Sequence, residues 1–218
     1  MADICPMEMI HALAEAYAEK FSSPEPAWAA ALSKETWEYH PQSHMLSGHV
    51  QGRFLSVISQ IMQPRFILEI GTFTGYSAGC LAEGLTPAGE LHTIECRESE
   101  ATVAKKYFNQ LPNGHQIQLH VGNALEIIPT LTPTWDLVFL DADKTGYSEY
   151  YTLVMKNLRK GGLLIADNIF FHGEVLQPEI TGKNARAIQA FTEMVASDSS
   201  TEKVIVTVRD GLVLIVKK

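Results

Sequence analysis

The chain has 218 residues, of which 46% are hydrophobic and 19% are charged, so it can bury one sizeable core. It carries 17 Lys and Arg against 25 Asp and Glu, a net charge of −8, and no basic run that would follow a phosphate backbone. This balance argues against extended nucleic-acid binding, and the length favours a single domain over residues 1–218.

The first ten residues give no sign of a targeting or membrane segment. Met1 to Ile10 have acidic side chains, no basic lead-in and no apolar stretch of the length that a signal peptide or membrane span needs. We therefore expect a cytoplasmic protein with no membrane contact. Cys5, Cys80 and Cys96 are odd in number and lack Cys-x-x-Cys spacing, which predicts neither a disulfide framework nor a thiolate metal site.

Apolar spacing in residues 1–63 is typical of helices. The Ser-Ser-Pro sequence at 22–24 predicts the start of a second helix, and Pro-Gln-Ser at 41–43 predicts its end before a third. The third helix would carry a row of apolar residues on one side: Val50, Phe54, Leu55, Ile58 and Ile61. We expect residues 1–63 to form a helical cap on a main sheet.

From residue 64 to 218, short apolar runs alternate with longer amphipathic segments, which predicts a doubly wound, Rossmann-like α/β core. The runs cover residues 66–70, 90–95, 116–121, 137–140 and 163–166. The end of the chain differs, because runs 204–208 and 212–216 are separated only by Arg-Asp-Gly, which is typical of a hairpin. We predict a mostly parallel sheet whose last strand runs antiparallel.

A tight turn follows the first predicted strand, where residues 69–77 read Glu-Ile-Gly-Thr-Phe-Thr-Gly-Tyr-Ser. A dinucleotide fingerprint needs a second glycine two residues after the first, and this chain has Phe73 there. No Gly-Lys-Ser or Gly-Lys-Thr completes a phosphate-binding P-loop either. The turn therefore argues against NAD binding and against a nucleotide-triphosphate loop.

A ligand with a carboxylate but no phosphate fits the turn better. Ser77 and the free N–H groups of the first helical turn would receive that carboxylate, and S-adenosylmethionine (SAM) is such a ligand. Glu95 ends the next strand about two dozen residues after Gly71, where doubly wound folds place an acid that binds ribose hydroxyls. The alternative is an ordinary strand-to-helix turn beside a surface glutamate.

Two oxygen-rich segments follow consecutive predicted strands: residues 140–144 read Leu-Asp-Ala-Asp-Lys, and 166–168 read Ala-Asp-Asn. We expect Asp141, Asp167 and Asn168 to converge at the carboxyl ends of neighbouring strands, the ligand crevice of open α/β sheets. Two carboxylates and a carboxamide suit Mg²⁺, with Mn²⁺ or Ca²⁺ as alternatives, and disfavour zinc. Either segment alone is more often structural, but together behind a SAM-type turn they predict a metal site.

This set of residues predicts a reaction. A coordinated cation lowers the pKa of a hydroxyl and orients it toward the methyl group that it attacks. Lys144 lies near the predicted metal, whose charge should depress its pKa and make it a candidate general base. We predict methyl transfer from SAM to an oxygen, with Asp141 and Lys144 as the catalytic residues.

From about Met45 to the C-terminus, these motifs resemble those of the cation-dependent O-methyltransferases, the family of caffeoyl-CoA and catechol O-methyltransferases. The resemblance implies a seven-stranded methyltransferase fold, a homodimer, Asp141, Asp167 and Asn168 on the metal, and Lys144 near the acceptor hydroxyl. It also implies cofactor contacts along one edge of the sheet, from Met45, Ser47, Glu69, Gly71, Phe73, Ser77, Glu95, Ala124 and Asp141.

The chain departs from that family around the acceptor. Plant relatives carry a Trp and an Asn in place of Phe171 and His172, and Val204 aligns with an acidic residue that orients the catechol in animal enzymes. The pair Phe170 and Phe171 would line an aromatic pocket or be plain core, and a lone His172 is more often a surface or core residue than a ligand. The role of this loop stays open.

We expect metal-dependent O-methylation of a vicinal hydroxyl on a small, catechol-like aromatic molecule. Two alternatives remain. One is the same chemistry on a hydroxylated transfer-RNA nucleoside, which the acidic charge disfavours. The other is a non-catalytic SAM-binding module, which the intact set of Asp141, Lys144, Asp167 and Asn168 disfavours.

Overall fold

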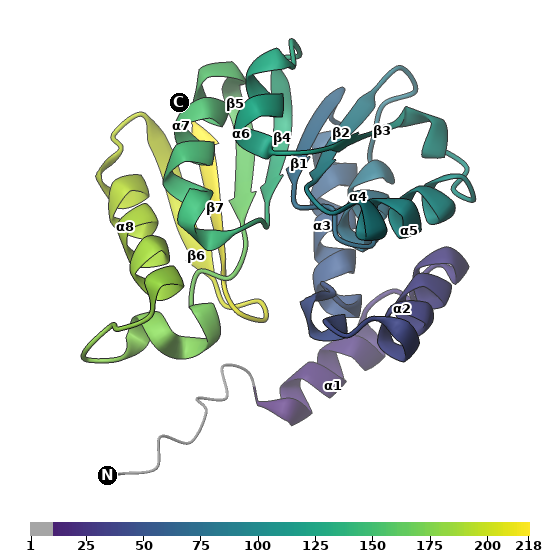
Figure 1. Ribbon diagram of the computed structural model, residues 1–218, viewed down its shortest axis with the longest axis horizontal. Coiled ribbons are helices and arrows are strands. Elements are labelled where there is room, and N and C mark those ends of the chain that lie inside the picture. The colour runs from purple at the N-terminus through teal and green to yellow at the C-terminus, as the bar shows by residue number, and fades with distance from the viewer. Residues whose placement is uncertain (1–10) are drawn as a thin grey trace.

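A seven-stranded sheet forms the centre of the computed structural model, which describes residues 11–218 (Figure 1). The N-terminal segment predicted to lack a targeting signal, including Cys5, lies outside the described residues. The strands are β1 (Phe66–Ile70), β2 (Glu90–Glu95), β3 (Ile117–Val121), β4 (Trp135–Leu140), β5 (Leu158–Ala166), β6 (Thr201–Val206) and β7 (Leu212–Lys217). The predicted α/β class is confirmed.

The sheet has the strand order β3-β2-β1-β4-β5-β7-β6. Strands β1 to β5 pair in parallel, whereas β7 runs antiparallel to both β5 and β6. The Arg-Asp-Gly turn between β6 and β7 therefore makes the predicted hairpin and reverses the last strand. Because β1 lies between β2 and β4, the chain leaves β1 toward one edge and later returns to its other side, which opens a crevice at the strand ends.

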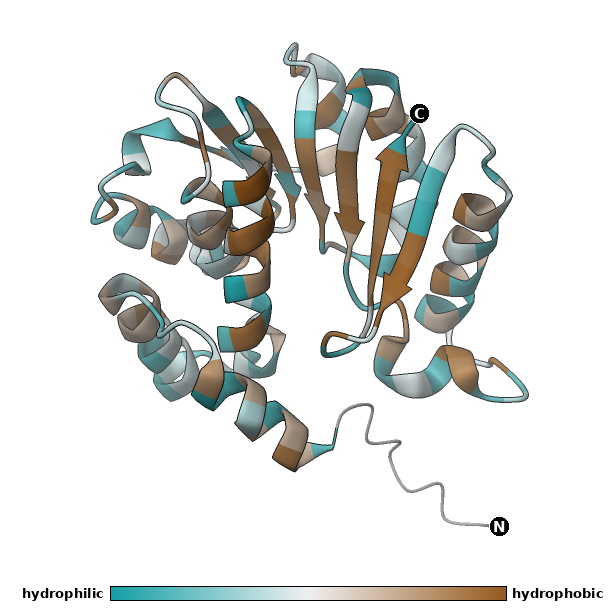
Figure 2. Ribbon diagram, turned by 180° about the vertical axis from the view of Figure 1, so that it is seen from behind, coloured by the Kyte–Doolittle hydropathy of each residue, from teal (hydrophilic) through white to brown (hydrophobic). Residues whose placement is uncertain are grey.

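Helices cover both faces of the sheet (Figure 1). The helices are α1 (Ala12–Phe21), α2 (Ala27–Tyr39), α3 (His49–Met62), α4 (Tyr76–Ala82), α5 (Glu98–Phe108), α6 (Ala124–Ile127), α7 (Tyr147–Asn157) and α8 (Lys183–Ser197). One core joins the sheet to α6, α7 and α8, and the other joins it to α3, α4 and α5. Figure 2 shows the hydrophobic colour concentrated along the central strands.

The cap is helical as predicted, but two details of the prediction are wrong. Helix α2 begins at Ala27, capped by Pro26, rather than at residues 22–24, since a residue that precedes proline is biased away from helical angles. Helix α3 buries Leu55, but Ile61 at its end is 74% exposed. The apolar row therefore turns partly away from the sheet.

Small and polar residues take the buried side of α3 instead. Gly52 packs so tightly on α4 that an added Cβ would lie 2.5 Å from Tyr76 Cε1, and Ser59 Oγ donates a 2.6 Å hydrogen bond to Leu81 O. Gln51 and Ser56 are buried on the same side. This close approach brings the cap against the strand ends.

Among residues 11–218, no helix is both long and apolar enough to cross a membrane.

Candidate active site

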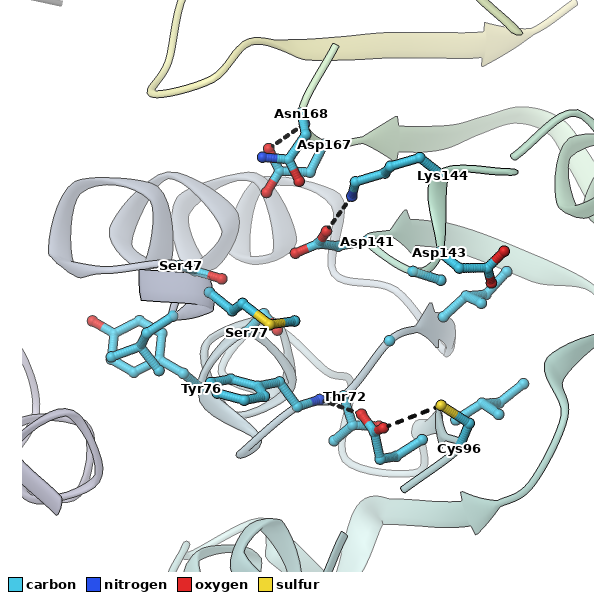
Figure 3. Close-up of a pocket in the computed structure, with 18 of the residues that line it drawn as sticks. Ser47, Thr72, Tyr76, Ser77, Cys96, Asp141, Asp143, Lys144, Asp167 and Asn168 are labelled. Carbon is cyan, nitrogen blue, oxygen red and sulfur yellow. Dashed lines mark hydrogen bonds and ion pairs between the residues drawn. The ribbon is translucent and has the colours of Figure 1, made fainter. Parts of the chain in front are cut away.

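A cavity of about 1060 Å³ lies at the carboxyl ends of the parallel strands (Figure 3). Strands β1, β2, β4 and β5 reach it through residues at or just beyond their ends: Gly71, Glu95, Asp141 and Asp167. The cap closes it from the other side with the segment that precedes α3. The cavity therefore occupies the crevice that the strand order opens.

All but one of the residues predicted to act in binding or catalysis line this cavity. They are Met45, Ser47, Gly71, Phe73, Ser77, Glu95, Ala124, Asp141, Lys144, Asp167 and Asn168. The exception, Glu69, is fully buried behind the turn, where its Oε2 accepts a hydrogen bond from Thr93 Oγ1 and its Oε1 has no partner among the described residues. Burial raises the pKa of Glu69 to about 8, and hydroxyl donors only partly oppose it.

Glycine shapes the turn between β1 and α4. Gly71 has a φ of 100°, and an added Cβ there would lie 1.9 Å from the backbone oxygen of Asp141. Gly75 has a φ of 95°, and its Cβ would lie 2.8 Å from the Phe108 ring. The left-handed backbone and the close approach both require glycine. The turn therefore brings the end of β1 directly against the end of β4.

The Glu95 carboxylate fixes the other side of the turn. Its Oε2 accepts a 2.7 Å hydrogen bond from Phe73 N, and its Oε1 accepts one of 3.0 Å from Arg97 N. The Arg97 guanidinium adds an ion pair of 3.2 Å. The Glu95 carboxylate therefore ties the glycine turn to the segment that follows β2, at the edge of the cavity that it lines.

The three predicted metal ligands lie side by side because their strands are neighbours. In the β4–β5 pairing Leu140 stands opposite Ala166, so the next residues, Asp141 and Asp167, leave the sheet together. Figure 3 shows their carboxylates and the Asn168 carboxamide grouped on one side of the cavity. Burial and the nearby Asp141 carboxylate raise the pKa of Asp167 to about 7. Because two neighbouring carboxylates repel each other, a positive charge between them would stabilise their ionised forms.

Lys144 supplies positive charge beside this group. Its Nζ donates hydrogen bonds of 2.8 Å to Asp141 Oδ1 and 2.7 Å to Tyr147 Oη. Burial alone would lower the pKa of Lys144, but the charge of Asp141 and groups near it raises it. In the absence of a cation, the surrounding acids therefore keep Lys144 protonated, and only further positive charge would release its proton.

Comparison with known proteins identifies the family to which this chain belongs. The sequence model of the O-methyltransferase family matches residues 19–218. The chain belongs to this family. It is a SAM-dependent O-methyltransferase. The match begins within α1, earlier than the resemblance from about Met45 had indicated.

Individual relatives agree with the family. A catechol O-methyltransferase of Niastella koreensis is 32% identical over 77% of this chain and 80% of its own length, and the "Probable caffeoyl-CoA O-methyltransferase 1" of Dictyostelium discoideum is 31% identical over 85% and 82%. Among solved structures, the O-methyltransferase TomG of Streptomyces achromogenes in complex with SAM superposes with a TM-score of 0.87, at 31% identity over 94% of this chain and 96% of that one. The predicted methyltransferase fold, the SAM cofactor and the O-methyl-transfer reaction class are confirmed.

The sequence analysis missed several residues of the O-methyltransferase site, among them Gln51 and Asp143. Gln51 of α3 is fully buried; its Nε2 donates a 2.6 Å hydrogen bond to Asp167 Oδ2, while its Oε1 has no partner among the residues that the structure describes. Asp143 lines the cavity and accepts a 2.6 Å hydrogen bond from Tyr150 Oη. The second acid of Asp-Ala-Asp-Lys was a visible signal for Asp143. No local pattern singled out Gln51.

Phe170 and Phe171 lie in different surroundings. Phe171 lines the cavity, whereas Phe170 packs on the β6–β7 hairpin, where an added Cβ at Gly211 would lie 2.5 Å from its ring. His172 also lines the cavity, with its side chain 71% exposed and its Nδ1 3.8 Å from Asp210 Oδ2. Phe171 therefore both lines the cavity and packs against the core, whereas Phe170 packs on the hairpin turn.

Proposed function

We propose that this O-methyltransferase transfers the methyl group of SAM to one hydroxyl of a small aromatic acceptor that carries two adjacent hydroxyls, at a site that holds a divalent cation. The grouping of Asp141, Asp167 and Asn168 beside Lys144 in one cavity carries the proposal. The names of the catechol and caffeoyl-CoA relatives support this class of acceptor. The chain's net charge of −8 disfavours an RNA acceptor.

The cofactor side of the cavity fits SAM. Gly71 lines the cavity without a side chain of its own, and Ser77 lies in the first turn of α4, whose free N–H groups suit a carboxylate. We assign Glu69 to the cofactor side because it lies behind the glycine turn with an Oε1 that has no partner among residues 11–218. We assign ribose binding to Glu95 and the wall beside the base to Ala124, with Met45, Ser47, Phe73 and Asp141 as further contacts.

The acceptor side fits a hard cation. Its ligand atoms are the oxygens of Asp141, Asp167 and Asn168, a set that suits Mg²⁺ and also admits Mn²⁺ or Ca²⁺. A cation held here would lower the pKa of an acceptor hydroxyl and fix its orientation.

We propose that Lys144 takes the proton from the acceptor hydroxyl. Its Nζ is held by Asp141 and Tyr147 at the edge of the predicted cation site, within reach of a proton at that position. Asp141 would act both as a ligand and as the group that orients Lys144. Phe171 offers an apolar surface for the acceptor ring.

The test is formation of S-adenosylhomocysteine from SAM with caffeoyl-CoA, caffeic acid and simple catechols, in Mg²⁺ or EDTA. We expect turnover that requires the cation in wild type and is lost in Asp141→Ala. Asp198→Asn, which removes an acid outside the cavity, is the matched control. Absence of turnover over the whole panel, in protein that still binds SAM, would reject the acceptor class. Turnover unchanged by EDTA would reject the cation.

We also propose that residues 1–218 work as one domain, as a homodimer and in the cytoplasm. Every residue of α1 is at least partly exposed, with Leu13, Tyr17 and Phe21 all more than 60% exposed. An apolar surface of this kind supports contact with a second copy. Light scattering after size exclusion would test it: a mass near 24.1 kDa, that of one chain, would reject the dimer.

A further inference from the structure

The hairpin turn between β6 and β7 is joined to the segment that follows β5. Ile169 N donates a 3.0 Å hydrogen bond to Gly211 O, and Phe170 N donates one of 2.9 Å to Asp210 O. These segments are separated by about 40 residues in the sequence and share no sequence motif. The turn therefore lies against the loop from Asn168 to His172, which forms one wall of the cavity and is called the acceptor loop below.

The Asp210 side chain extends this connection to a proposed metal ligand. Its Oδ2 accepts a 3.0 Å hydrogen bond from Asn168 Nδ2, and its Oδ1 accepts one of 2.7 Å from His172 N. The side chain is only 14% exposed. Both carboxylate oxygens are thus used, one on each end of the loop from Asn168 to His172.

This geometry decides which way the Asn168 carboxamide points. A carboxylate can only accept hydrogen bonds, so the group facing Asp210 must be the NH₂ of Asn168 rather than its oxygen. The oxygen is then left on the other side, and Asn168 lines the cavity. A cation needs that oxygen and is repelled by the NH₂ group.

The backbone here also needs an anchor. Of the six non-glycine residues with positive φ among the described residues, four lie in these two segments: Asn168, Phe171, His172 and Arg209. Residues other than glycine rarely adopt this backbone conformation, and it persists only where surrounding contacts hold it. Two of these four residues, Asn168 and His172, donate hydrogen bonds directly to the Asp210 carboxylate.

We propose that Asp210 is a positioning residue for the cation: its carboxylate holds Asn168 with the oxygen toward the cavity and ties the acceptor loop to the same anchor. The proposal rests on the cation site of the proposed function. Asp210 itself touches neither the cofactor nor the reacting atoms. It acts through Asn168, as hydrogen-bond partners of metal ligands do elsewhere.

A double-mutant cycle with Mn²⁺ as the probe tests this role. Binding is measured by electron paramagnetic resonance on wild type, Asp210→Asn, Asn168→Asp and the double variant. Asp210→Asn should weaken Mn²⁺ binding about tenfold or more, because one of the two donors loses its acceptor and the Asn168 amide is free to turn. In the Asn168→Asp background the same change should strengthen binding, since it replaces two facing carboxylates by a donor and an acceptor.

This reversal of sign distinguishes positioning from a general structural role, which would act in the same direction in both backgrounds. Equal effects of Asp210→Asn in both backgrounds, or none in either, would overturn the proposal. SAM affinity and melting temperature serve as checks on folding, and Asp198→Asn, far along the chain from the loop, should leave Mn²⁺ binding unchanged. Wild type that does not bind Mn²⁺ would reject the cation site itself, and this proposal with it.

A measurement on wild type alone guards against variants that fail to fold. The side-chain NH₂ of Asn168 should exchange slowly with solvent in nuclear magnetic resonance spectra before any cation is added, because Asp210 already binds it. Exchange as fast as that of an exposed asparagine would overturn the proposal.

Discussion

The cofactor side and the metal side of the cavity are built in different ways. On the cofactor side, the contacts join adjacent strands through the backbone: Phe73 N binds Glu95, and Gly71 packs against the backbone of Asp141. On the metal side, they join side chains that are distant in sequence. Gln51 reaches Asp167 across 116 residues, and Asn168 reaches Asp210 across 42.

The difference teaches where each side is vulnerable. The cofactor side depends on the space left by missing side chains, so adding one methyl group should damage it. The metal side depends on the pairing of donors with acceptors, so a substitution of equal size should damage it without changing the packing. The Lys144 and Gln51 predictions below act on the metal side and use SAM binding as their control, the Gly71 prediction acts on the cofactor side, and the pH prediction involves one acid from each side.

The largest effect should follow Lys144→Met. Loss of a general base typically lowers kcat by about 10²- to 10⁴-fold, whereas SAM affinity should stay within about threefold because Lys144 serves the metal side. Lys144→Arg should lose as much, since arginine keeps the charge but does not release a proton at neutral pH. Lys106→Met, at an exposed ion pair with Glu35, is the control. A kcat preserved in Lys144→Arg would contradict the role of base.

Gly71→Ala should be next and should act on the cofactor side. The added Cβ would clash with Asp141 O, and the φ of 100° is unfavourable for alanine. We therefore expect the free energy of unfolding to fall by about 3 kcal/mol or more and SAM binding to be lost. Gly48→Ala separates the two causes, because Gly48 has a φ of 78° but nothing within 4 Å of an added Cβ. Urea unfolding and calorimetric SAM titration measure both. Equal losses in the two variants would show that the clash does not matter.

A smaller effect should follow Gln51→Leu, a change of similar size. Asp167 would lose its hydrogen bond from Nε2, and we expect Mn²⁺ binding to weaken about tenfold while SAM binding is kept. Gln60→Leu on the same helix, where the amide donates a hydrogen bond to Ser56 Oγ, is the matched control. Unchanged Mn²⁺ affinity would show that the cap contributes nothing to the metal side.

The smallest effect concerns pH. Asp167 and Glu69 have raised pKa values, of about 7 and about 8, so between pH 4 and 8 the folded protein binds protons that the unfolded chain has released. The cation-free protein should therefore lose stability as pH rises through this range. Urea midpoints at pH 5 and pH 8, with and without Mg²⁺, measure it. Asp167→Asn should flatten the decline, and a midpoint that rises with pH would contradict the prediction.

The sequence alone determined the parts that depend on neighbouring residues. Alternating apolar runs gave the strands, the glycine turn at 69–77 identified SAM rather than NAD, and the acids at the ends of β4 and β5 converged because parallel neighbours end at the same edge. Each of these follows from local geometry and one rule of sheet topology. The hairpin turn and the reversed last strand follow in the same way.

Only the tertiary structure decided the rest. It turned Ile61 outward and Gln51 inward, because the close approach of α3 to α4 favours small residues over an apolar row. It also placed Asp210 on Asn168 and Phe171, rather than Phe170, in the cavity. These outcomes depend on contacts between residues separated by 22 to 116 positions in sequence, and such contacts leave no local spacing or periodicity by which sequence could reveal them.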